Sequence, residues 1–230
     1  MGVSGAQRSA REAYAEAMVS RMETPELALG PWASYDLVHD PKRLAFVLAR
    51  YKFCARMLEG KRRVLEVGCG DALGLPIVAQ AVGEIVAVDW DGRQLEGNAR
   101  RLPHLRNVRY ALHDFNRAPL DVRVDAIYWI DVLEHLEPAR EETFLTHLVA
   151  CLAPGGVLVT GTPNLTAADH ASPQSRIHHI NLKDHEALRE LTLRYFENAF
   201  LFGMNDEVLH TGFGPMCHYL WSLGVGPRRG

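Results

Sequence analysis

Long apolar runs, paired cysteines and an excess of basic charge are all missing from this sequence. No run approaches the roughly 18 to 20 apolar residues that a membrane-spanning helix needs, and the N-terminal stretch lacks the apolar core of a secretory signal. The four cysteines form no CxxC pair, which favours buried thiols over a disulfide framework or a zinc site. With 25 basic and 28 acidic residues, bulk charge does not favour polyphosphate binding. We expect a cytoplasmic protein with no membrane span and no nucleic-acid partner.

What the chain does contain is a rhythm of short apolar runs separated by helix-compatible segments. The predicted strands are 62–68, 84–90, 108–114, 124–131 and 156–162, and the predicted helices between them are 72–82, 91–102 and 138–152. Strands that alternate with helices predict an α/β fold with a doubly wound, mainly parallel sheet.

The segments outside this rhythm predict the rest of one structural domain. Two N-terminal helices, 5–22 and 42–58, suggest that residues 1–59 form a helical cap or lid over a Rossmann-like catalytic region, 60–230. After the fifth strand we expect a polar loop (163–183), a helix (184–196) and a strand (198–204). The closing apolar run MCHYLWSLGV is typical of a terminal strand or a subunit contact, so a homodimer stays open.

The stretch VLEVGCGDALG (64–74) has the pattern of a ligand-binding turn after the first strand. Gly68 and Gly70 have no Cβ atoms, so the chain can turn sharply and a ligand can approach the backbone. The third glycine comes one position later than in the dinucleotide pattern GxGxxG. Glu66 and Asp71 would repel a pyrophosphate and favour a cationic ligand. The pattern therefore disfavours a nicotinamide oxidoreductase.

Two further acids end the second and third strands, at the edge of the sheet where ligands bind in such folds. Asp89 follows Gly70 by 19 residues, a spacing at which a carboxylate can accept hydrogen bonds from both ribose hydroxyls. Asp114 and Phe115 could offer a carboxylate to an exocyclic amine and a ring to a purine. Taken singly, Asp89 and Asp114 could be helix caps. Together with the glycines they predict an adenosine that carries a cationic group.

At these motifs the sequence resembles the class I S-adenosylmethionine-dependent methyltransferases. The resemblance lies in VLEVGCGDALG, VAVDW, LHDF, VDAIYWIDVLEHL and LAPGGVLVTGTPN, and covers roughly residues 60–165. It implies a seven-stranded sheet whose last strand is antiparallel, with S-adenosyl-L-methionine as the cofactor. The cofactor-binding residues implied by the resemblance are Glu66, Gly68, Cys69, Gly70, Asp89, Trp90, Asp114, Phe115 and Ile130.

The segment IDVLEHLEP (130–138) is similar to the metal-carrying segment of quinone-biosynthesis O-methyltransferases. That family has an ExxEH pattern, and Asp131, Glu134 and His135 give DxxEH here. The resemblance implies a divalent metal such as Mg²⁺ on these three residues, although the shorter aspartate departs from the pattern. Two other interpretations remain: His135 as a general base, or a helix start with Asp131 as its cap.

The loop after the fifth strand is the part of this family that contacts the methyl acceptor. The loop and the start of the next predicted helix hold four histidines, His170, His178, His179 and His185. Of these, His178 and His179 lie between two isoleucines and are the better candidates for a base. The sequence thus predicts methyl transfer to an oxygen atom of a small polar acceptor, which is a sugar-like or other specialised metabolite. The alternatives are N-methylation of a small amine or amino sugar, and a methyltransferase-like binding module without turnover.

Overall fold

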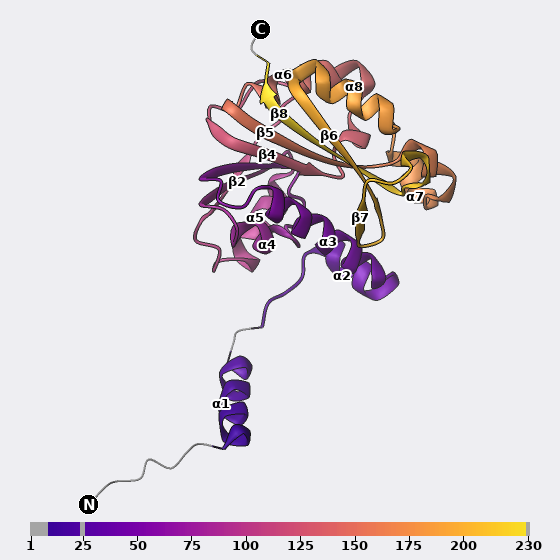
Figure 1. The fold of residues 1–230 in the computed structure, drawn as a ribbon. Coiled ribbons are helices and arrows are strands. Elements are labelled where there is room, and N and C mark those ends of the chain that lie inside the picture. Colours follow the sequence, from indigo (N-terminus) through magenta and orange to yellow (C-terminus); the bar gives the residue numbers. More distant parts are fainter. Residues whose placement is uncertain (1–8, 24–25, 229–230) are drawn as a thin grey trace, which may run out of the picture.

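The computed structural model describes residues 9–23 and 26–228 and contains one eight-stranded sheet (Figure 1). Its strands are β1 (Arg63–Val67), β2 (Glu84–Asp89), β3 (Val108–Leu112), β4 (Val124–Ile130), β5 (Leu152–Pro163), β6 (Phe196–Asn205), β7 (Val208–His210) and β8 (Tyr219–Pro227). The strand order is β3-β2-β1-β4-β5-β8-β6-β7. The five strands from β3 to β5 are parallel, and β8 runs antiparallel to both β5 and β6. The predicted mainly parallel sheet is confirmed.

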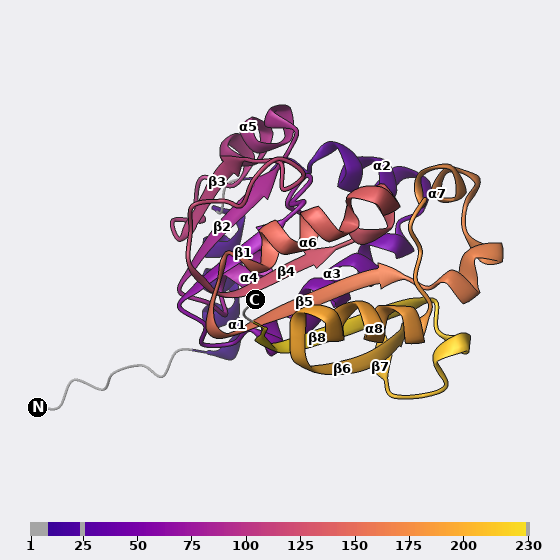
Figure 2. The same cartoon turned by 90° about the horizontal axis from the view of Figure 1, so that it is seen from above.

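Helices cover both faces of this sheet (Figures 1 and 2). The α-helices are α1 (Ala10–Met22), α2 (Pro31–His39), α3 (Lys42–Met57), α4 (Leu75–Ala79), α5 (Gly92–Arg101), α6 (Glu141–Val149), α7 (Pro173–His178) and α8 (His185–Tyr195). Short 3₁₀ helices are η1 (Leu133–His135), η2 (Pro138–Arg140), η3 (Leu165–His170) and η4 (Gly214–Met216). Helices α3, α4 and α5 lie on one face, and α6 and α8 lie on the other.

The alternation of side chains along the central strands produces two separate cores. On β4, Ala126 and Tyr128 belong to the core beneath α3–α5, whereas Ile127 and Trp129 belong to the core beneath α6 and α8. A strand buried on both faces needs apolar residues at successive positions, which is why this strand has no polar alternation. The two cores hold the carboxyl ends of β1, β4 and β5 in fixed positions at one edge.

Three features differ from the sequence-based expectation. The sheet has eight strands rather than seven, because β7 pairs with β6 as an additional short edge strand. Helix α2 lies between the two predicted N-terminal helices and was not predicted; Pro31 occupies its first turn, where the missing N–H costs nothing. Segment 163–183, expected to be a polar loop, contains η3 and α7.

The N-terminal helices differ in how they relate to the sheet. Helix α1 has no buried residue and stands apart from the sheet in Figure 1; positions 5–8 of the predicted helix lie outside the described residues. Helix α3 packs against α4 and contributes buried residues to the core. None of the helices within the described ranges is both long and apolar enough to cross a bilayer. All four cysteines are buried and unpaired, as expected.

Candidate active site

The glycine turn after β1 leaves open space above its backbone. Gly68 and Gly70 both have left-handed backbones, with φ of +72° and +49°. A Cβ on Gly68 would collide with Val132 at 2.5 Å, whereas a Cβ on Gly70 would meet nothing within 4 Å. Gly68 therefore has to be glycine for the turn to pack, and Gly70 presents bare backbone to any molecule above it.

Asp89, at the end of β2, holds this turn in place. One of its carboxylate oxygens accepts a hydrogen bond from Gly70 N–H at 2.9 Å, and the other accepts one from Asp91 N–H at 2.9 Å. Because each carboxylate oxygen has two lone pairs, both can accept a further bond, as two ribose hydroxyls would require. The neighbouring Trp90 is 75% exposed, so its ring is free to cover a ligand.

Asp114 and Phe115, which follow β3, have different environments: Asp114 is partly exposed and Phe115 is buried. Burial opposes ionisation of Asp114, but hydrogen bonds from Asn116 keep the pKa of its carboxyl below the usual value. Phe115 is only 1% exposed, and its ring packs against Phe144 of α6. The aromatic surface predicted here for a purine therefore lies in the core, and the carboxylate alone remains at the edge.

Glu66 lies buried beneath the glycine turn, at 2% exposure. Burial raises the pKa of its carboxyl to about 8, against the opposing effect of the Tyr128 and Tyr51 hydroxyls. Its Oε2 atom nevertheless makes no well-formed hydrogen bond. The side chains of Cys69 and Ile130, also predicted to contact the cofactor, are buried. At neutral pH Glu66 is mostly uncharged, which weakens the charge argument made from the sequence.

Asp71, the second acid of the turn, binds to the N-terminal helical region. Its carboxylate accepts a hydrogen bond from Ala33 N–H at 2.8 Å, in the first turn of α2, and so acts as an N-cap supplied by another segment. A Cβ on Gly30, which precedes that helix, would lie 2.3 Å from Asp71. The late third glycine, Gly74, has a similar role, because a Cβ there would lie 2.0 Å from the Tyr51 ring of α3. The turn is thus joined to both α2 and α3.

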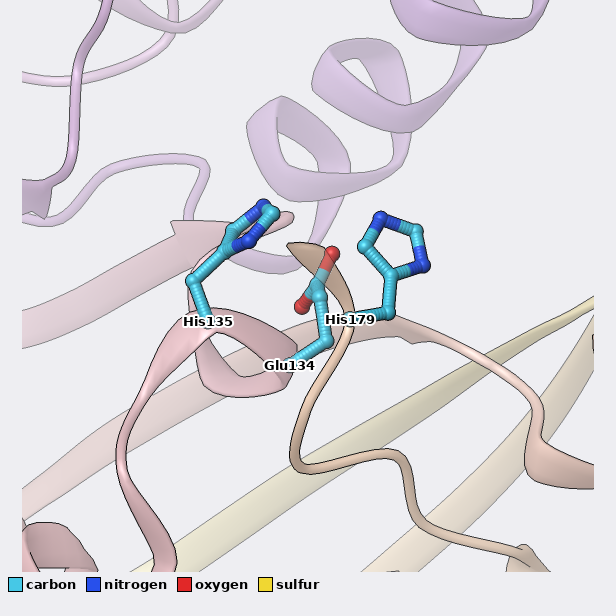
Figure 3. A group of neighbouring side chains, drawn as sticks. All are labelled: Glu134, His135 and His179. Atoms are coloured by element: carbon cyan, nitrogen blue, oxygen red, sulfur yellow. The ribbon is translucent and has the colours of Figure 1, made fainter. Parts of the chain in front are cut away.

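A carboxylate and two imidazoles converge just beyond the ends of β4 and β5 (Figure 3). Glu134 and His135 belong to η1, and His179 follows α7. One ligand atom from each of the three lies within 4.8 Å of the others. Their arrangement suits a divalent metal ion or a proton acceptor.

Contacts around this group fix its geometry. Thr162 of β5 donates a hydrogen bond to Glu134 Oε2 at 3.1 Å, while Glu134 Oε1 has no partner. His135 Nδ1 lies 3.1 Å from the His178 carbonyl oxygen, which leaves Nε2 available. The Glu134 carbonyl accepts hydrogen bonds from the backbone amides of Ile180 and Asn181, which hold the His179 segment against η1.

Burial shapes the proton affinities of the group. Burial and the nearby charge of Asp131 raise the pKa of Glu134 well above its usual value. Partial burial and the neighbouring His135 lower the pKa of His179 below 6.5. His179 is therefore neutral at physiological pH and can accept a proton.

The structure does not place Asp131 with the other two predicted metal ligands. It is ion-paired with Arg50 of α3, whose Nη1 lies 2.7 Å from Asp131 Oδ2. The group with metal-ligand geometry contains His179 in its place. Among the predicted catalytic histidines, His178 has an exposed side chain and contributes its carbonyl, whereas His135 and His179 face each other with ring centroids 5.2 Å apart.

Sequence reasoning missed Arg50, Thr162 and Tyr219 as site residues. Arg50 lies in the predicted helix 42–58, Thr162 lies in the quoted stretch LAPGGVLVTGTPN and Tyr219 lies in the closing apolar run, and nothing beside them in the sequence indicated a role in the site. A hollow in the described surface lies elsewhere, at the start of β5, and includes Arg123 and Pro154. It shares no residue with the group around Glu134.

Comparisons with known proteins agree with this geometry. Residues 65–158 match the family described as "Methyltransferase domain". A probable S-adenosylmethionine-dependent methyltransferase of Mycolicibacterium smegmatis is 31% identical over 104 residues, which are 45% of this chain and 38% of that protein. A trans-aconitate 2-methyltransferase of Methylobacterium radiotolerans is 33% identical over 116 residues, 49% of this chain and 43% of that protein. The chain thus matches less than half the length of these curated relatives.

The fold likeness extends further along the chain. The crystal structure of the N-methyltransferase NodS from Bradyrhizobium japonicum WM9, in complex with S-adenosyl-L-homocysteine, superposes with a TM-score of 0.61 at 18% identity. That superposition covers 92% of this chain and 98% of NodS. At such identity the likeness concerns the fold alone.

Proposed function

We propose that this chain, whose residues 65–158 match a methyltransferase domain family, is a class I S-adenosylmethionine-dependent methyltransferase that transfers a methyl group to a hydroxyl of a small polar acceptor. The observation that carries the proposal is the glycine turn, where open space above Gly70 adjoins the carboxylate of Asp89. A nucleoside lying there would direct its sulfonium along the sheet edge toward β4. The group around Glu134 follows β4 directly.

The reaction requires alignment and a proton acceptor. The carbon–sulfur bond breaks as the carbon–oxygen bond forms in line with it, and the hydroxyl proton has to leave. Positioning the two reactants accounts for much of the acceleration in such a step. His179, neutral because its pKa is lowered, is the candidate base for that proton. Glu134, held by Thr162, fixes the floor of the acceptor site.

The donor set of the same group fits a divalent metal. We propose Glu134, His135 and His179 as its ligands, since Glu134 Oε1 is buried without a partner and the three ligand atoms are close enough. This arrangement is the alternative to His179 as the base, because an imidazole that coordinates a metal has no lone pair left for the hydroxyl proton. One carboxylate with two imidazoles suits Zn²⁺, Mn²⁺ or Fe²⁺ better than the Mg²⁺ expected from the sequence, which prefers an all-oxygen site. Such an ion would supply positive charge that lowers the pKa of the acceptor hydroxyl.

Two measurements test the methyltransferase proposal. Calorimetry with S-adenosyl-L-homocysteine tests the cofactor site, and failure to bind at millimolar ligand would refute it. Incubation with S-adenosylmethionine and a panel of hydroxylated and amine metabolites, followed by mass spectrometry, identifies any product that gains one methyl group. Transfer only to amines would replace the hydroxyl assignment by N-methylation.

A third measurement tests the metal independently of activity. We expect Zn²⁺ or Mn²⁺ to bind the wild type in calorimetry, and His179→Ala to weaken that binding by about tenfold or more. His170→Ala, which removes an exposed histidine of η3, is the matched control. Equal affinity in the two variants would place the metal elsewhere.

A further inference from the structure

Beside the group around Glu134, three side chains from distant parts of the sequence form a compact unit. Arg50 comes from α3, Asp131 follows β4, and Tyr219 begins β8. The Arg50 guanidinium pairs with Asp131 at 2.7 Å and lies over the Tyr219 ring, with its central carbon 3.9 Å from the ring centroid. The ion pair and the ring together restrict the guanidinium to one orientation.

Each member of this unit keeps a buried polar atom without a hydrogen-bond partner. These atoms are Arg50 Nε, Asp131 Oδ1 and Tyr219 Oη. Burial and the nearby Asp131 carboxylate raise the pKa of the Tyr219 hydroxyl, but the carboxylate and the hydroxyl make no well-formed hydrogen bond. Nearly all buried polar groups in folded proteins are well paired, so three that are not, in mutual contact, need an explanation. They offer a donor, an acceptor and a hydroxyl side by side, which is the set a polar ligand would use.

The backbone at Asp131 also carries strain. Its φ is +56°, and Asp131 is one of three residues other than glycine with positive φ in the described part of the chain. Strain of this kind is concentrated at functional sites, where it directs a side chain to a required position. Here it accompanies a carboxylate pointed toward Arg50.

We propose that the Arg50–Asp131 pair, held on Tyr219, binds the methyl acceptor and selects an uncharged hydroxylated compound. The inference rests on the proposed function and names the class of its acceptor. The opposite charges of the pair cancel, so a carboxylate gains from Arg50 but is repelled by Asp131, and an ammonium experiences the reverse. A hydroxyl can accept from Arg50 Nε and donate to Asp131 Oδ1 at once.

Matched acceptors that differ only in charge test this selection. A hexose with its uronic acid and its amino sugar forms one set, and a catechol with carboxylate and amine derivatives forms another. For each compound the rate of methyl gain at low acceptor concentration is measured by mass spectrometry. We expect the wild type to favour the neutral member of at least one set by about tenfold or more.

Variants that remove one charge should shift this preference in opposite directions. Asp131→Asn leaves Arg50 uncompensated, and the ratio of carboxylate to neutral acceptor should rise by about tenfold. Arg50→Gln leaves Asp131 uncompensated, and the ratio of amine to neutral acceptor should rise by a similar factor of about ten. Arg50→Lys retains the charge without Nε, so transfer to every member of a set should fall by a similar factor, with little change in either ratio. Arg56→Gln, on the same helix as Arg50, breaks an exposed ion pair with Glu59 and is the control.

The outcomes separate the inference from the function beneath it. Melting temperature and S-adenosyl-L-homocysteine binding are recorded for every variant, so that a misfolded variant is recognised. If a charge-removing variant misfolds, the Arg50→Lys result is used instead. Unchanged ratios in both charge-removing variants, a wild type that prefers a charged acceptor, or no methylation in either set despite cofactor binding would overturn the inference. If the wild type did not bind S-adenosyl-L-homocysteine, the methyltransferase proposal would be overturned instead.

Discussion

Glu66→Gln should make the protein more stable at pH 8 and leave its stability almost unchanged near pH 5. The glutamine keeps the shape of the buried side chain and removes its ability to ionise. In the folded protein burial raises the pKa of Glu66 to about 8, from an ordinary value of 4.5 in the unfolded chain. The folded state therefore retains a proton that the unfolded state releases as the pH rises above 4.5.

The sign and size follow from this difference. The wild-type carboxyl contributes fully to stability below pH 4.5, and that contribution is lost as the pH rises toward about 8. The loss is about 1.4 kcal/mol per pH unit and becomes smaller close to pH 8, so between pH 5 and pH 8 it amounts to roughly 3 to 4 kcal/mol. For a chain of this size, that difference corresponds to a change in melting temperature of roughly 6 to 16 °C.

Urea unfolding at intervals between pH 5 and pH 8 measures the effect. Other titrating groups act equally in both proteins, so the difference between the two free-energy curves isolates Glu66. Glu207→Gln, at an exposed position in the turn between β6 and β7, is the control and should give a flat difference. Parallel curves for the wild type and Glu66→Gln would refute the proposed burial of an uncharged carboxyl.

Two further predictions concern the glycine turn. Gly70→Ala should weaken S-adenosyl-L-homocysteine binding, measured by calorimetry, by about tenfold or more, because its methyl group would enter the ligand space. Gly60→Ala is the control, since Gly60 has φ +80° and equally open space. It should cost a similar backbone strain of about 1 kcal/mol and leave binding intact. Asp71→Ala should destabilise the protein by about 1 kcal/mol through loss of the Ala33 N–H cap, with faster hydrogen exchange confined to α2; uniform exchange across the fold would contradict this.

Much of the sheet and of the cofactor side could be predicted because the relevant signals are local. Strands buried on both faces are short apolar runs, and their ends are marked by Gly68, Gly70 and Asp89 within a few residues of each strand. Parallel neighbours bring their carboxyl ends to one edge, so these residues meet without further information. The predicted resemblance to methyltransferases is supported by the family match over residues 65–158. The individual cofactor contacts stay predictions.

The short elements were missed because their signals are weak or ambiguous. Pro31 and Pro173 each begin a helix, yet a proline in a sequence equally marks an interruption. Whether the Phe115 ring would be buried or exposed depended on the face of the sheet on which it lies. Its ring entered the core beside α6, and nothing adjacent to it in the sequence distinguishes that outcome from exposure at the edge.

The sequence by itself determined the alternation of strands and helices, the glycine turn and the acid at the end of β2, because periodicity and strand ends are properties of neighbouring residues. Only the tertiary structure decided what Asp131 does. The sequence grouped it with Glu134 and His135, but α3, 81 positions away, supplies Arg50 as its partner. His179 then joins Glu134 from a segment that two backbone hydrogen bonds hold against η1. Such pairings depend on how whole elements pack, so no spacing in the chain encodes them.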